Sequence, residues 1–266
     1  MYARGSNRNK AAVSESNNPR RLRRWQLKIL RTATTELTDA DWDELLALYT
    51  QTYEILLADL QASVRGKSFL YRVYERATGR LVGAAAYAAF PIEVPGKGRI
   101  VVFYAGDIVL RPEIRGAGLI QEMGLGGVIR EVLRDPWTPK YLYAIALTHK
   151  LYRSVASMFQ DYWPRHDRET PPEILEIMER VGRRVDQNRW RSATELLQIP
   201  RRGRQEQLAV PEEQLADPVI RFFIDKNPTY LQGTCLPIMM PLDARNLASV
   251  VRTLVARRSA RTRPRA

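Results

Sequence analysis

The amino-acid sequence predicts a mixed fold of the α+β or α/β class, built around one sheet with helices packed on it. Two patterns in the chain predict it. Short apolar runs of strand length are joined by glycine turns, and longer segments whose apolar residues recur at helical spacing lie before and after them. With 266 residues and 45% hydrophobic composition, the chain can bury one sizeable core or two small ones.

The N-terminal elements begin with a strand expected over residues 25–32. Thr38 followed by Asp41 forms a capping-box-like helix start. Apolar residues then recur at helical spacing, which predicts one long amphipathic helix. They are Trp42, Leu45, Leu46, Tyr49, Tyr53, Leu56, Leu57 and Leu60.

Three further strands are expected to form a meander. The runs 69–77 and 81–90 are joined by Thr78-Gly79-Arg80, a hairpin signal. The turn at 95–98 then leads to the strand 100–110, and Gly106 inside that strand predicts a bulge or the close approach of another backbone or a ligand.

The second half of the chain predicts a strand at 141–148, apolar enough to be buried on both faces and to pair in parallel with the preceding strand. Helices are expected over 152–162 and from 170–172 onward. A late strand is expected at 233–240. Asp243 then caps a last helix, in which apolar residues recur at helical spacing.

These elements divide the chain into five predicted parts. Residues 1–24 form a basic disordered tail, and 25–163 form the ligand-binding core. Residues 164–232 form an insertion or lid, polar and rich in arginine over 185–230. Residues 233–258 return to complete the core, and 259–266 form a second basic tail.

A glycine turn after the strand 100–110 carries the strongest functional signal. Arg115-Gly116-Ala117-Gly118 leads into a helix that starts at Leu119 and Ile120. Glycines let a ligand approach the main chain, and the free N–H groups of a helix's first turn attract anions, so the segment predicts a phosphate site. The alternative is a helix that merely starts after a tight turn, with Arg115 solvated. Neither the dinucleotide-binding fingerprint nor the P-loop spacing is present.

The turn resembles the acyl-CoA-binding motif of the GNAT acyltransferase superfamily, Arg/Gln-x-x-Gly-x-Gly/Ala. Arg115 and Gly118 match it, whereas Ile120 stands where the family prefers Gly or Ala. The resemblance implies a mostly antiparallel central sheet with helices on both faces, here with an extra C-terminal helical region. It also implies acetyl-CoA or a longer acyl-CoA as co-substrate. Residues 115–120 would then hold the pyrophosphate.

The same resemblance implies a reaction centre beside that turn. It assigns the oxyanion donor and the pantetheine-binding edge to the strand ending at Leu110, with Ile108 and Leu110 as the positions. It places a general acid near Tyr152, which could equally be a core tyrosine. His149 has the pKa range of a general base but could be structural. Asp107 could hold the amine or accept its proton, or could stabilise the bulge, and we rank it above His149 because a carboxylate in an apolar strand is costly unless paired.

The formal charge of +13 is concentrated at the two ends of the chain. Residues 1–31 carry +8 and residues 252–266 carry +6, so the part between them is close to neutral. This argues against a broad basic groove, although the tails could contact polyanions such as nucleic acid or anionic lipid. One cysteine and two histidines give no zinc spacing, so no metal is expected. The absence of a long apolar run predicts a cytoplasmic protein with no transmembrane segment.

The leading functional hypothesis is an N-acyltransferase that uses acyl-CoA or acyl carrier protein. Its acyl chain could be longer than acetyl, and its acceptor would be a small-molecule or peptide amine. The alternatives are a non-catalytic GNAT-like binding module with basic tails, and a nucleic-acid-binding protein for which salt-sensitive binding would not depend on Arg115.

Overall fold

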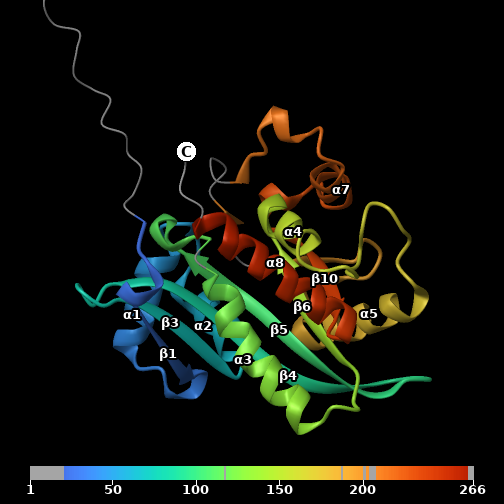
Figure 1. The fold of residues 1–266 in the computed structure, drawn as a ribbon, viewed down its shortest axis with the longest axis horizontal. Helices are drawn as coiled ribbons and strands as arrows, with labels where there is room; N and C mark the ends of the chain where they lie inside the picture. Colours follow the sequence, from blue (N-terminus) through green and yellow to red (C-terminus); the bar gives the residue numbers. More distant parts are fainter. Residues whose placement is uncertain (1–20, 117, 187, 200–201, 204–207, 263–266) are drawn as a thin grey trace, which may run out of the picture.

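A computed structural model describes residues 21–116, 118–186, 188–199, 202–203 and 208–262. The predicted fold class is confirmed, because an eight-stranded mixed sheet carries helices on both faces (Figure 1). The strands are β1 (Leu27–Ala33), β2 (Tyr53–Glu54), β3 (Phe69–Glu75), β4 (Leu81–Val94), β5 (Gly98–Leu110), β6 (Lys140–Ala146), β7 (Trp190–Arg191), β8 (Leu196–Gln198), β9 (Arg202–Gly203) and β10 (Thr234–Pro241). The helices are α1 (Asp39–Tyr49), α2 (Leu57–Arg65), α3 (Leu119–Arg134), α4 (His149–Ala156), α5 (Pro172–Asp186), α7 (Pro218–Lys226) and α8 (Ala244–Thr262).

The strand order of the large sheet is β1-β3-β4-β5-β6-β10-β8-β7. The predicted meander is present, since β3, β4 and β5 pair antiparallel, and Gly79 adopts a φ of 69° in the first turn. The predicted parallel pairing of β5 with β6 is also present, from Val101 opposite Lys140 to Ala105 opposite Ala144. All other described strand pairings are antiparallel.

The prediction of one long helix through residue 60 is wrong. The capping box of Thr38 and Asp41 is confirmed, but α1 ends at Tyr49 and α2 begins only at Leu57. Between them the chain turns, with the Thr52 N–H donating to the Tyr49 carbonyl, and β2 pairs with β9. β-branched threonines lose side-chain freedom in a helix, which favours a break here.

The helices form two layers on the sheet. On one face, α3 packs through Leu119 and Met123 on Tyr87 and Ala105, and α4 and α8 lie beside it (Figure 1). On the other face, α1 and α2 cover Ala84 and Ala86, and α5 packs on the far end of the sheet. Because successive strand residues point to opposite faces, both sides of β4 and β5 are buried.

The segment after residue 163 contributes to the sheet as well as to its covering. Helix α5 begins at Pro172 as expected, and β7 and β8 then add two strands next to β10. Helix α7 packs on α4. The helix expected over 152–162 is shorter and earlier, His149–Ala156, because β6 ends at Ala146 and Thr148 caps the helix by accepting from the Leu151 N–H.

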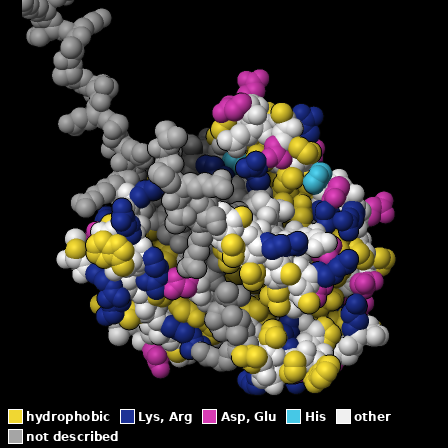
Figure 2. Space-filling model, in the orientation of Figure 1, with side chains coloured by type: hydrophobic (Ala, Val, Ile, Leu, Met, Phe, Trp, Pro, Cys, Tyr) yellow, Lys and Arg dark blue, Asp and Glu magenta, His cyan; other side chains and the backbone are white. Residues whose placement is uncertain are grey.

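The late strand and last helix are confirmed, and Asp243 accepts a hydrogen bond from the Asn246 N–H at the start of α8. Helix α8 continues to Thr262, so part of the expected C-terminal tail is helical. Of the two predicted tails, residues 1–20 and 263–266 lie outside the described residues. On the face shown in Figure 2, Lys and Arg side chains are interspersed with acidic and hydrophobic ones.

Candidate active site

The site is positioned by a bulge in the middle of the sheet. Residues Ala84 and Ala86 of β4 pair with Val109 and Gly106 of β5, so β5 has an extra residue here, and Asp107 adopts a φ of 49°. The paired register of β5 with β6 ends at Ala105. The two strands therefore separate at the bulge, and the edge of β5 from Gly106 to Leu110 borders the opening between them.

The glycine at the bulge is explained by close approach. A Cβ atom on Gly106 would lie 2.9 Å from the Cε atom of Lys67 and 3.1 Å from the ring of Tyr104. The expected bulge is thus present, and the groups that approach Gly106 are side chains of the protein itself.

An apolar cleft of about 770 Å³ follows this opening on the face covered by α3, α4 and α8. Strands β5 and β6 form its floor, and the three helices supply its walls. Residues representative of these walls are Ile120, Gly124 and Val128 of α3, Lys150, Ser154 and Met158 of α4, and Leu247, Val250 and Leu254 of α8. We refer to this space as the apolar cleft.

The glycine turn lies at one end of the apolar cleft, where Arg115, Gly116 and Ile120 contribute to its lining. Gly116 and Gly118 have φ values of 75° and 80°, which side chains rarely adopt, so the turn requires glycine at both positions. The exposed Arg115 and Lys150 place two cations on the lining. The turn thus combines positive charge with the start of α3, as an anion site needs.

One expected donor of the turn is already engaged. The Arg115 N–H donates to the Pro112 carbonyl at 3.2 Å, and its Nε donates to the Leu110 carbonyl at 2.9 Å. The backbone N–H of Arg115 is therefore not a phosphate donor, which corrects the expectation that the amides of the whole segment serve this role. The side chain is likewise held at the end of β5 rather than simply solvated.

A buried ion pair lies at the bulge. The Asp107 carboxylate accepts from Lys67 Nζ at 2.5 Å and from the Ser63 hydroxyl at 2.9 Å. Both charged side chains are almost fully buried, and the Tyr49 hydroxyl donates to the Asp107 carbonyl oxygen. The carboxylate is thus held by side chains of α2 and of the turn after it, while Asp107 also contributes to the lining of the apolar cleft. Lys67 and Ser63 were not anticipated, because they are 40 and 44 residues from Asp107 in sequence.

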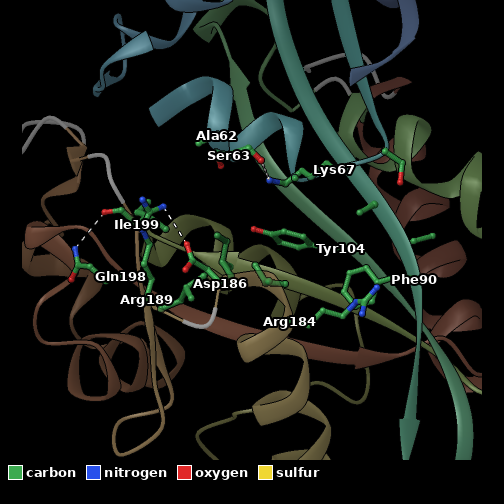
Figure 3. Close-up of a pocket in the computed structure, with 17 residues that line it drawn as sticks. Ala62, Ser63, Lys67, Phe90, Tyr104, Arg184, Asp186, Arg189, Gln198 and Ile199 are labelled. Carbon is green, nitrogen blue, oxygen red and sulfur yellow. Dashed lines mark hydrogen bonds and ion pairs between the residues drawn. The ribbon is translucent and has the colours of Figure 1, made fainter. Parts of the chain in front are cut away.

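A second cavity, of about 610 Å³, opens on the opposite face of the sheet (Figure 3). We refer to it as the polar pocket. Helix α2 with Lys67 forms one side, Tyr104 and Phe90 lie on the sheet, and Arg184, Asp186 and Arg189 come from α5 and the residues after it. Ile145 and Ile199 line both the polar pocket and the apolar cleft, so the two spaces are adjacent.

The structure does not place Tyr152 in the apolar cleft. Its ring is fully buried among Tyr162, Phe222 and Phe223, and its hydroxyl donates to the Pro164 carbonyl at 2.8 Å. Burial strongly raises the pKa of this phenol. Tyr152 is thus a core residue, the alternative weighed for it from the sequence, because α7 supplies aromatic partners that the sequence pattern did not reveal.

His149 is also a buried residue outside the cleft lining. It is the first residue of α4 rather than the end of a strand. Burial, together with the neighbouring charge of Lys150, lowers the pKa of the imidazole. A neutral, enclosed imidazole serves packing here, so Asp107 is the one expected acid or base that reaches the cleft.

Five of the eight anticipated ligand-binding positions lie together in the structure. Those that line the apolar cleft are Ile108, Leu110, Arg115, Gly116 and Ile120. Leu119 instead points into the core beneath α3, and Gly118 shapes the turn without lining the cleft. Ala117 lies outside the described residues. Lys150 and the walls from α8 were missed, although the apolar spacing of α8 was recognised.

The described residues contain neither a candidate metal cluster nor a candidate membrane-spanning helix. No group of three or more His, Cys, Asp or Glu side chains in this part of the chain is arranged to hold a metal ion. Within the same ranges, no helix combines the length and apolarity needed to cross a bilayer.

The chain resembles known proteins in structure rather than in sequence. No protein-family model and no curated protein matches the chain. An acetyltransferase from Trypanosoma brucei aligns at 22% identity with a TM-score of 0.35, over 55% of this chain and 97% of its own. A probable N-acyltransferase from Enterococcus faecalis aligns at 16% identity with a TM-score of 0.34, over 53% of this chain and 37% of its own.

A GNAT family N-acetyltransferase from Escherichia coli, YhbS, solved in complex with CoA, aligns at 17% identity with a TM-score of 0.32. That alignment covers 48% of this chain and 67% of the other. Over about half its length, the chain is thus similar to solved structures described as an acetyltransferase, a probable N-acyltransferase and a GNAT family N-acetyltransferase.

Proposed function

We propose that this protein is an N-acyltransferase that transfers an acyl group from acyl-CoA, or from acyl carrier protein, to an amine. The observation that carries the proposal is the opening between β5 and β6. A stretch of β5 there does not pair with β6, and it borders an apolar cleft whose lining also includes the glycine turn and two cations, Arg115 and Lys150. A phosphorylated thiol carrier needs these three features in this order: an anion site, an extended edge for its amide arm, and an apolar space for its acyl group.

The reaction balances with groups found at the bulge. The neutral amine attacks the thioester carbonyl carbon, a C–N bond forms, the C–S bond breaks, and the proton lost by the amine ends on the departing thiolate. We assign the backbone N–H groups of Ile108 and Leu110 to the oxyanion, a contact worth a few kcal/mol in acyl transfer. Asp107, held by Lys67, is the proposed proton acceptor for the amine.

The apolar cleft supports a donor longer than acetyl. Most of its wall residues are apolar, among them Met158 on α4 and Leu254 on α8. An acetyl group needs no such space, whereas each buried methylene of a long chain contributes about 0.8 kcal/mol.

Thermal stability with added donor tests the proposal, since a ligand that binds the native state raises the melting temperature. We expect CoA to raise it, and octanoyl- or palmitoyl-CoA to raise it further. Arg115→Ala combined with Lys150→Ala should abolish the CoA shift. Arg153→Ala is the matched control, because Arg153 is an exposed cation of α4 that pairs with Asp217 and does not line the cleft.

No shift with CoA, any of the acyl-CoAs or acylated carrier protein would overturn the donor assignment. Acylation of an amine mixture, followed by mass spectrometry, tests the chemistry separately from binding.

A non-catalytic binding module is the second candidate, and one observation favours it. Neither Tyr152 nor His149 lines the cleft, so an acid for the departing thiolate is not evident among the residues described there. A CoA-dependent thermal shift without amine acylation, from any donor length, would select this candidate.

A further inference from the structure

The polar pocket carries an unbalanced positive charge. Its lining includes three cations, Lys67, Arg184 and Arg189, and one acid, Asp186. Lys67 is paired with Asp107 at 2.5 Å, and Arg189 with Asp186 at 3.3 Å. For Arg184, no ion pair is found within the described part of the chain. One cation of the pocket is therefore left without a carboxylate.

Arg184 is also held in place for an anion. Its guanidinium Cζ lies 4.8 Å from the centre of the Phe90 ring, and both residues border one end of the pocket (Figure 3). A guanidinium stacked on an aromatic face retains its in-plane N–H groups, and their fork matches a carboxylate or a phosphate. Stacking also reduces the side-chain freedom that a bound anion would otherwise have to remove.

The other end of the pocket leads to the reaction centre. Tyr104 lies between Arg184 and Lys67 in Figure 3, and Lys67 Nζ lies 4.8 Å from the centre of the Tyr104 ring. Lys67 in turn contacts Asp107 at the bulge. A molecule that occupied the pocket would thus have one end near a free cation and the other near the proposed acyl-transfer site.

We infer that the polar pocket binds the acceptor, and that the acceptor is an amine that also carries an anionic group, a carboxylate or a phosphate, held by Arg184. This rests on the proposed function and narrows its acceptor to one chemical class. It excludes polyamines and other purely cationic amines, for which the surplus charge of Arg184 is repulsive.

Calorimetric binding of matched amine pairs to the full chain tests the inference. The first pair is phenylalanine and 2-phenylethylamine, which differ by a carboxylate, and the second is phosphoethanolamine and ethanolamine, which differ by a phosphate. We expect the anionic member of at least one pair to bind tenfold or more tightly than its partner. The pair that shows the preference identifies the anion.

Two variants of α5 assign the preference to Arg184. Arg184→Gln should reduce it to less than threefold. Arg180→Gln should leave it unchanged, because Arg180 pairs with Glu176 on the exposed side of the helix and does not line the pocket. Both side chains are exposed, so both variants are expected to fold, which circular dichroism verifies.

Equal affinities within both pairs, no binding of either anionic amine, or a preference that survives in Arg184→Gln would each overturn the inference. The thermal shift with CoA separates this failure from that of the proposed function. An intact CoA shift without anion preference removes only the acceptor class. An anion preference without any CoA shift removes the acyl donor and leaves an anion-binding pocket.

Discussion

The apolar cleft and the polar pocket lie on opposite faces of the same strands but differ in what lines them. Aliphatic side chains from α3, α4 and α8 dominate the cleft, whereas charged side chains from α5 and the segments after α2 and α5, with aromatic ones from β4 and β5, border the pocket. The period of two along β5 produces this difference: Phe103 and Ala105 line the cleft, and Tyr104 between them lines the pocket. One strand thus presents a different chemistry to each side.

This difference in lining indicates where the two substrates of an acyl-transfer reaction would meet. An apolar acyl chain and a charged amine need different solvation, so they are held apart until their reacting atoms are adjacent. Here the two spaces share the lining residues Ile145 and Ile199, and the paired Lys67 and Asp107 line the pocket and the cleft respectively. The variants that follow change first the Lys67–Asp107 pair, which we call the junction, then the polar pocket and then the apolar cleft.

The largest effect is expected from Asp107→Asn at the junction. Asparagine retains the shape and tolerates positive φ, but it leaves the Lys67 charge buried without its partner. Breaking a buried pair in this way costs about 3–5 kcal/mol of unfolding free energy. Urea denaturation measures it.

The double variant Lys67→Met with Asp107→Asn is the control for this charge effect. Removing the orphaned cation should restore half or more of the lost stability. Equal instability of the single and double variants would mean that the bulge geometry, rather than the ion pair, holds the two spaces together.

On the side of the polar pocket, Gly182→Ala tests how tightly α5 packs against its neighbours. A Cβ atom there would lie 2.2 Å from the ring of Trp190, a residue of β7 that packs against α5. Overpacking of this kind costs about 1–3 kcal/mol, more than the roughly 1 kcal/mol that alanine gains over glycine in a helix. We expect a lower melting temperature.

Gly66→Ala is the matched control, because its Cβ would meet only ordinary contacts at 3.5 Å or more and Gly66 also borders the polar pocket. It should leave the melting temperature nearly unchanged. Equal losses in both variants would contradict the tight packing of α5 on β7.

The apolar side is tested by Val250→Trp, which narrows the cleft from α8. Val250 lines the cleft and is buried, whereas the next residue, Val251, is exposed. We expect palmitoyl-CoA affinity to fall tenfold or more while acetyl-CoA affinity changes little, as measured by calorimetry. Val251→Trp should affect neither. A parallel loss of both ligands would place the acyl chain elsewhere.

The features predicted well from the sequence are those determined by neighbouring residues. Thr38 and Asp41 form their capping box, Asp243 caps α8, and Gly79 turns the hairpin, because each requires only contacts a few residues apart. The bulge was anticipated from Gly106 for the same reason, since a glycine in an apolar strand is itself a signal.

The features that were missed depend on residues far apart in the chain. The break between α1 and α2 is fixed by β2 pairing with β9, about 150 residues later. Tyr152 is directed into the core by Phe222 and Phe223 of α7, which followed a stretch with no clear pattern. Periodicity shows that a residue is buried, but not which later element buries it.

The smallest effect is expected at His149, on the helix that forms a wall of the apolar cleft. A variant there distinguishes a role in stability from a role in catalysis. Burial, with added repulsion from Lys150 and Arg153, lowers the pKa of this imidazole below its usual 6.5. Below pH 6.5 the unfolded chain therefore binds more protons than the folded one, so stability falls as pH falls from 6.5 towards the folded pKa. His149→Gln should lessen this loss by about 1.4 kcal/mol for each unit of pKa difference, measured by urea denaturation at pH 7.5 and 5.5. At pH 7.5 the same variant should retain its acylation rate, whereas a large loss of rate there would restore His149 as a general base.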